Sequence, residues 1–147
     1  MKVLNAEGLV LGRLASYAAK MALIGEDVII VNSEMAVVLG ERRMVFERYL
    51  KRLRRKNLGN YRKGPYHQKR PDKMLRRTVR NMLPFNSIRG REAYKRIMTY
   101  IGVPREEIMR KHNVNIGDVK FEGDLIKKGV SNFVTLEDIS EFIGGNF

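Results

Sequence analysis

The densest cluster of chemically active side chains in this 147-residue sequence consists of six cations within nine positions. They are Arg48, Lys51, Arg52, Arg54, Arg55 and Lys56. Guanidinium and ammonium groups bind anions, above all phosphates. Like charges at helical spacing repel one another unless carboxylates are interleaved, yet the sixteen Lys and Arg residues between positions 42 and 80 have only Glu47 and Asp72 among them. This imbalance indicates that an external polyanion supplies the missing negative charge.

The segment 57–71 mixes aromatic rings with further cations, and its glycines and prolines predict a loop. Its candidate binding residues are Tyr61, Arg62, Lys63, Tyr66, His67, Lys69 and Arg70. Aromatic rings stack on unpaired bases while cations follow the phosphates. The mixture therefore favours RNA or single strands over duplex DNA.

A third group of cations follows on a predicted helix. Its members are Arg76, Arg77 and Arg80, and Arg89 lies further along the chain. The helix is indicated by an apolar stripe at helical spacing, and Pro84 ends it. Asp72, directly after Pro71, is the predicted N-cap. Guanidinium groups on such a rigid element suit bidentate phosphate contacts.

The distribution of charge supports the same interpretation. The formal net charge is +13, and 20 of the 29 Lys and Arg residues lie within 42–96, together with only three of the 16 acids. The flanking segments 1–41 and 97–147 are mildly acidic. Because 44% of the residues are hydrophobic, a packed core is expected. We expect one domain over 1–147 with a basic RNA-binding segment at 42–96.

Several other chemistries are disfavoured by composition. The sequence has no cysteine, and His67 and His112 lie 45 residues apart, so neither a thiolate site nor a multi-histidine metal site is expected. The N-terminus does not resemble a signal peptide, and the most apolar helical stretch, Leu14–Ile24, is short and contains Lys20. We therefore expect a cytoplasmic protein with no metal, no cofactor, no small-molecule substrate and no membrane contact.

The stretch Gly8-Leu9-Val10-Leu11-Gly12 is similar to a dinucleotide-binding turn but lacks the Gly-x-Gly-x-x-Gly spacing. No Walker A pattern or nucleophile elbow is present, so we expect no catalytic residues and no enzyme. Three alternatives remain open at this point: a nucleotide-dependent enzyme that acts on RNA, a duplex-DNA architectural protein, and a free RNA-binding translational regulator that uses the same basic surface.

The elements that must position these residues follow an α/β order. The predicted elements are a strand at 3–4, a helix at 13–24, a buried strand at 28–31, a strand at 36–39, helices at 41–56 and 72–83, a short helix near 93–94, a strand at 97–101 and a helix after Thr135. Strand, helix and buried strand within about 30 residues indicate a βαβ unit. Thr135 and Asp138 have the spacing of a capping box.

Four motifs resemble one known family. They are Lys63-Gly64-Pro65-Tyr66-His67, Arg77-Thr78-Val79-Arg80-Asn81-Met82-Leu83-Pro84, Leu11-Gly12-Arg13-Leu14-Ala15 and Ile97-Met98-Thr99-Tyr100-Ile101-Gly102-Val103-Pro104. Together they are similar to the large-subunit ribosomal protein thirteen family in its archaeal and eukaryotic form, over roughly residues 3–104. Asn81 stands where this family pattern has a glycine.

The resemblance implies a three-layer α/β/α fold with a small, mostly parallel four-stranded sheet. It also implies a structural component of the large ribosomal subunit that binds large-subunit rRNA, helps early assembly and contacts neighbouring ribosomal proteins. No enzymatic activity and no cofactor are implied.

Overall fold

Strand β2 (Val28–Val31) forms the centre of a three-stranded parallel sheet in the computed structural model, which describes residues 1–113 and 132–147. It pairs with β1 (Lys2–Asn5) on one side and with β4 (Ile97–Thr99) on the other. All four residues of β2 are buried, as its run of β-branched side chains predicts for a strand covered on both faces.

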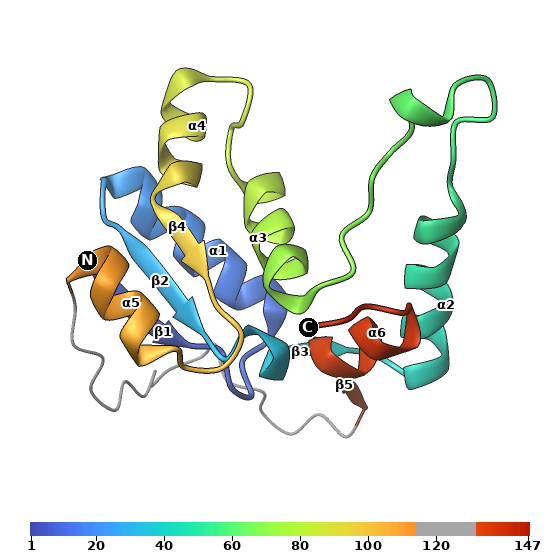
Figure 1. The fold of residues 1–147 in the computed structure, drawn as a ribbon, viewed down its shortest axis with the longest axis horizontal. Helices are drawn as coiled ribbons and strands as arrows, with labels where there is room; N and C mark the ends of the chain where they lie inside the picture. Colours follow the sequence, from blue (N-terminus) through green and yellow to red (C-terminus); the bar gives the residue numbers. More distant parts are fainter. Residues whose placement is uncertain (114–131) are drawn as a thin grey trace.

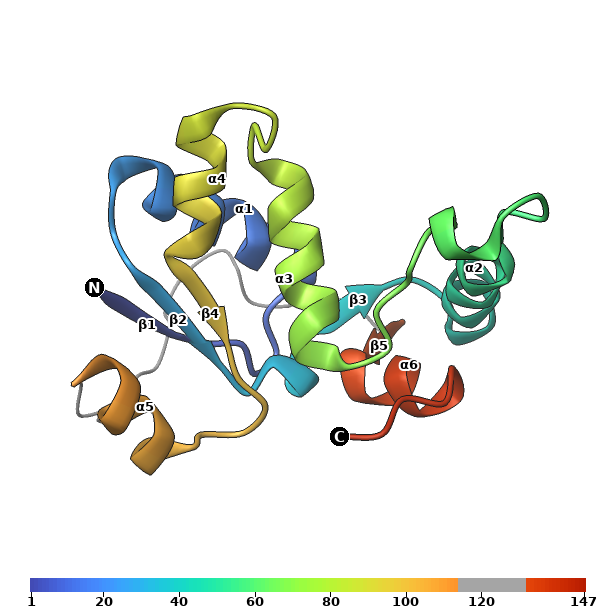
Figure 2. The same ribbon diagram turned by 45° about the horizontal axis from the view of Figure 1, so that its top comes forward.

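Helices cover both faces of this sheet, as Figures 1 and 2 show. Helices α1 (Leu11–Ile24), α3 (Pro71–Met82) and α4 (Ile88–Lys95) lie on one face, and α5 (Arg105–His112) lies on the other. The predicted α/β class, with three layers and a mostly parallel sheet, is confirmed.

The side chains of β2 alternate between two hydrophobic cores. Val28 and Ile30 belong to the larger core, which lies beneath α1, α3 and α4. Ile29 and Val31 pack with Ile108 of α5 in the smaller core. This alternation follows from the two-residue period of a strand.

One of the four predicted strands, at 36–39, lies outside the parallel sheet, which therefore has three strands rather than four. Strand β3 (Val37–Leu39) instead pairs antiparallel with β5 (Phe133–Thr135) in a separate two-stranded sheet. The chain leaves the parallel sheet at Asn32, whose φ of 53° is left-handed, and a 3₁₀ turn η1 (Ser33–Met35) follows directly. This sharp turn changes the direction of the chain before β3. A pattern of apolar residues does not reveal such a change of direction.

Helices α2 (Arg42–Arg54) and α6 (Leu136–Phe142) follow the two strands of this second sheet and pack against each other. The rings of Phe46 and Phe142 stack with their centroids 4.3 Å apart. Val45 is fully buried in the larger core, which therefore extends from the parallel sheet to α2.

The helix ends follow the sequence signals with one correction. The capping box of α6 is present, because the Thr135 hydroxyl accepts from the Asp138 N–H at 3.1 Å and the Asp138 carboxylate accepts from the Thr135 N–H at 3.4 Å. Asp72, however, is not the N-cap of α3. Pro71 takes the first helical position, for which its fixed φ is suited, and Arg70 becomes the N-cap. Asp72 instead forms an ion pair with Arg70 at 3.3 Å.

Among the described residues, no helix is long and apolar enough to cross a membrane. The same part of the chain contains no group of three or more His, Cys, Asp or Glu side chains placed to hold a metal ion.

Candidate RNA-binding surface

The amphipathic pattern of α2 separates its apolar side chains from its cations. Phe46, Tyr49 and Leu53 are half-buried beside Val45 and pack against the larger core. Burial raises the pKa of Tyr49 despite the nearby guanidinium groups, so its phenol stays neutral at physiological pH. The exposed cations of this helix beyond its first turn are Arg48, Lys51, Arg52 and Arg54.

These four cations have no carboxylate within 4.0 Å among the described residues. The first turn of α2 differs, because Arg42 lies 3.6 Å from Asp138 and Arg43 lies 3.1 Å from Glu47. Carboxylates of the chain thus neutralise only the arginines of the first turn of α2. The rest of the helix presents uncompensated positive charge, which phosphates could neutralise.

The loop between α2 and α3 extends from the end of α2 and returns to the start of α3, as Figure 1 shows. Its tip is held by its own hydrogen bonds. The Asn57 side-chain oxygen accepts from the backbone N–H groups two and three residues further on, at 3.1 and 3.2 Å. The Tyr66 hydroxyl donates to the Arg62 carbonyl at 2.7 Å, beside the 3₁₀ turn η2 (Tyr61–Lys63). The loop therefore has a defined shape.

The returning end of the loop is anchored to α6. Ser140, which is buried, donates from its hydroxyl to the Lys69 carbonyl at 2.7 Å. The Lys69 ammonium group donates to the Gly144 carbonyl at 3.4 Å. Gly145 permits this close approach, since a Cβ there would lie 2.9 Å from the Lys69 carbonyl oxygen.

The predicted binding residues of the loop are exposed to solvent. They are Arg55, Lys56, Arg62, Lys63, Tyr66, His67, Lys69 and Arg70. Among the apolar and aromatic side chains of the loop, Leu58 is 99% exposed and Tyr66 is 71% exposed. The side chain of Tyr61 lies outside the described part of the chain.

The arginines of α3 and α4 divide into two groups. Arg77 is exposed and borders the space between α3 and α2. Arg76 instead lies 4.7 Å from the centre of the Tyr94 ring, and its Nε is buried without a hydrogen-bond partner in the described structure. It therefore contributes to the packing of α3 against α4.

Arg80 and Arg89 also lie away from α2. The Arg80 guanidinium is 3.8 Å from the centre of the Phe85 ring, at the end of α3. Arg89 donates to the Leu23 carbonyl at 3.4 Å, at the C-terminal end of α1. A cation at this end of a helix stabilises its unpaired carbonyls. The structure thus brings Arg77, but not Arg76, Arg80 or Arg89, next to α2 and the loop.

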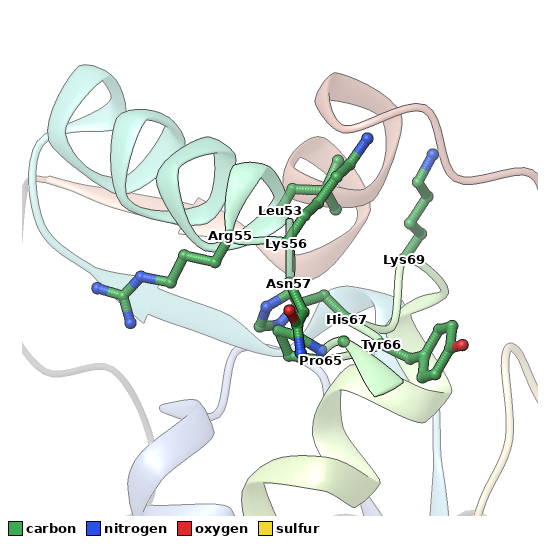
Figure 3. Close-up of a pocket in the computed structure, with 9 residues that line it drawn as sticks. Leu53, Arg55, Lys56, Asn57, Pro65, Tyr66, His67 and Lys69 are labelled. Carbon is green, nitrogen blue, oxygen red and sulfur yellow. The ribbon is translucent and has the colours of Figure 1, made fainter. Parts of the chain in front are cut away.

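Two adjoining hollows connect α2, the loop and α3. The larger has a volume of 380 Å³ and lies between the end of α2 and the returning loop, as Figure 3 shows. The smaller, of 100 Å³, lies where α2, the loop, α3 and α6 meet. Leu53 and His67 line both. None of the described residues that line either hollow is acidic.

We call the exposed cations of α2 beyond its first turn and of the loop, together with Arg77, the basic surface. It comprises Arg48, Lys51, Arg52, Arg54, Arg55, Lys56, Arg62, Lys63, Lys69, Arg70 and Arg77. Two polar residues that were not among the predicted binding residues also shape it. Asn57 organises the loop tip, and Asn81 is exposed and lines the smaller hollow. An Asn followed by Gly two positions later was the available signal for the first.

Comparison with known proteins identifies the family to which the sequence belongs. The family described as "Ribosomal protein L13" matches residues 1–106. The chain is 40% identical to "Large ribosomal subunit protein uL13" of Methanococcus maripaludis and to that of Methanocaldococcus jannaschii, with all of each chain covered. It is 42% identical to the protein of the same name from Archaeoglobus fulgidus, with 97% of this chain and 86% of the relative covered. The chain therefore belongs to the ribosomal protein L13 family and is a structural component of the large ribosomal subunit.

Proposed function

We propose that this chain binds large-subunit rRNA directly through the basic surface and that this binding helps early assembly of the subunit. The ribosomal setting supplies both rRNA and other proteins as possible partners. The observation that carries the proposal is the uncompensated charge of α2. Arg48, Lys51 and Arg54 are exposed and have no carboxylate within 4.0 Å among the described residues. An RNA backbone supplies the anions that the protein lacks.

Binding would combine charge with shape. The deep, narrow major groove of A-form RNA hides its base edges from side chains, so recognition depends on backbone contacts and on unpaired bases. If the surface contacts roughly 6–10 phosphates, raising the salt from 50 to 200 mM should reduce affinity by about 10³–10⁵, because binding releases the counterions of those phosphates. The α/β core supports this surface, since Val45 fixes α2 to the core and Ser140 fixes the loop to α6.

Direct binding is tested by competition at near-physiological salt. Labelled, protein-free large-subunit rRNA is bound to the chain and then challenged with excess transfer RNA or duplex DNA. We expect rRNA binding to survive both competitors, because a fixed arrangement of cations matches one folded RNA better than bulk polyanion. Use of protein-free rRNA also tests the early role, which requires binding before other proteins are present. Displacement by either competitor in proportion to its nucleotide content would contradict the proposal.

The family assignment decides against the enzyme alternative, because the L13 family consists of structural ribosomal proteins. In the structure, the Gly8–Gly12 stretch has a different role from that of a dinucleotide-binding turn. Gly8 adopts a left-handed φ of 68° in the turn after β1, and Gly12 lies in the first turn of α1. Both positions thus serve the connection between β1 and α1.

A further inference from the structure

We infer that the larger hollow beside His67 receives one unpaired nucleotide of the bound rRNA. This inference rests on the proposed function and goes further, since it assigns a base-binding site within the basic surface. The volume of 380 Å³ lies within the range of about 300–1,000 Å³ typical of small-ligand sites. A base in an RNA duplex cannot enter such a hollow, whereas a base turned out of a loop or bulge can.

The lining of the hollow suits a nucleobase. Leu53 and Pro65 supply apolar contacts, and the imidazole of His67 supplies a flat ring, on which a base can stack. The ring of His67 has no hydrogen-bond partner among the described residues, so no contact within the chain withholds its face from a base. Asn57, whose oxygen already accepts from the loop backbone, retains its amide N–H groups to contact the edge of that base.

The charges around the hollow suit the phosphates on either side of that base. Figure 3 shows the side chains of Lys56 and Lys69 extending in the same direction from the rim. Beyond His67, the smaller hollow is lined by Arg52 and Arg77. Cations therefore line both of the hollows that share His67, as a chain entering and leaving the site would require. No described residue of either lining is acidic, which favours a nucleotide over a cationic or neutral ligand.

The test compares a variant that lacks the ring of His67 with a variant that carries a different flat ring at the same position. The probe is protein-free large-subunit rRNA, and its dissociation constant is measured for the wild-type chain, for His67→Ala and for His67→Phe at several salt concentrations. Loss of one base stack should weaken binding by about 5- to 150-fold in His67→Ala, whereas His67→Phe should stay within about threefold of wild type. The slope of affinity against salt should not change, because a base contact releases no counterions.

The control is Met109→Ala on α5, an exposed residue outside the basic surface, which should bind like wild type. Because His67 is exposed and its ring has no partner in the described structure, thermal unfolding should be the same for all four proteins. If His67→Ala binds rRNA as tightly as wild type, or if its salt slope falls, the base-binding inference is wrong while the proposed function stands. Failure of the wild-type chain to resist transfer RNA in the competition assay would instead overturn the proposed function.

Discussion

Replacing Lys51, Arg55 and Lys56 together by glutamine is expected to weaken rRNA binding by at least about tenfold, since each hydrogen bond to a charged group contributes roughly 1.5–3 kcal/mol. The slope of log affinity against log salt should fall by about 2 to 3, because each phosphate contact releases 0.7–0.9 counterion. All three residues are exposed, without an ion pair in the described structure, so the melting temperature should change little. Filter binding across a salt series measures both quantities.

The matched control removes the same charge elsewhere. Lys20 on α1 and Arg105 and Arg110 on α5 are exposed and lie outside the segment 42–96. Their combined replacement by glutamine lowers the net charge equally but should leave both affinity and salt slope near the wild-type values. Equal losses in the two triple variants would show that net charge, rather than the basic surface, determines binding.

Gly90→Ala should destabilise the protein strongly, by about 3 kcal/mol or more. The Ser87 hydroxyl caps α4 by accepting from the Gly90 N–H at 3.1 Å, and it donates to the Pro84 carbonyl at 2.8 Å. This tight turn brings the Pro84 backbone so close that a Cβ on Gly90 would lie 2.5 Å from its carbonyl carbon. Backbone atoms cannot move aside as a flexible side chain can, so α4 must shift. Urea unfolding measures the loss.

Gly12→Ala is the matched substitution for this test. Gly12 lies in α1, is exposed, and has no atom within 4 Å of the position that a Cβ would take. Alanine should leave stability unchanged or raise it by up to about 1 kcal/mol, because it favours the helix. Similar unfolding free energies for the two variants would mean that the turn at Pro84 is not a packing constraint.

Local patterns predicted the elements of the parallel sheet well. The β-branched run Val28–Val31 indicated a strand buried on both faces, and the structure places it at the centre of the sheet. The separate pairing of β3 was not predictable in the same way. Leu39 lies opposite Phe133 in that ladder, more than 90 positions away in the sequence. A three-residue strand has no periodicity that would identify so distant a partner.

The candidate site shows the same division between local and distant information. Exposure of the α2 and loop cations followed from amphipathic spacing and composition. The position of Arg76 did not, because it depends on Tyr94 from another helix. Nor did the environment of His112, which is half-buried with its Nε2 3.0 Å from the Tyr100 hydroxyl. The hollow at His67 depends on the path of the whole loop, which no short motif encodes.

Contact between the basic surface and rRNA can be tested within the large subunit itself. The experiment is ultraviolet crosslinking of assembled subunits, followed by mass spectrometry of the crosslinked peptides. We expect crosslinks in α2, in the loop 55–70 and at Arg77 of α3, which together carry the basic surface. Crosslinks confined to α1, α4 and α5, with none in α2 or the loop, would contradict it.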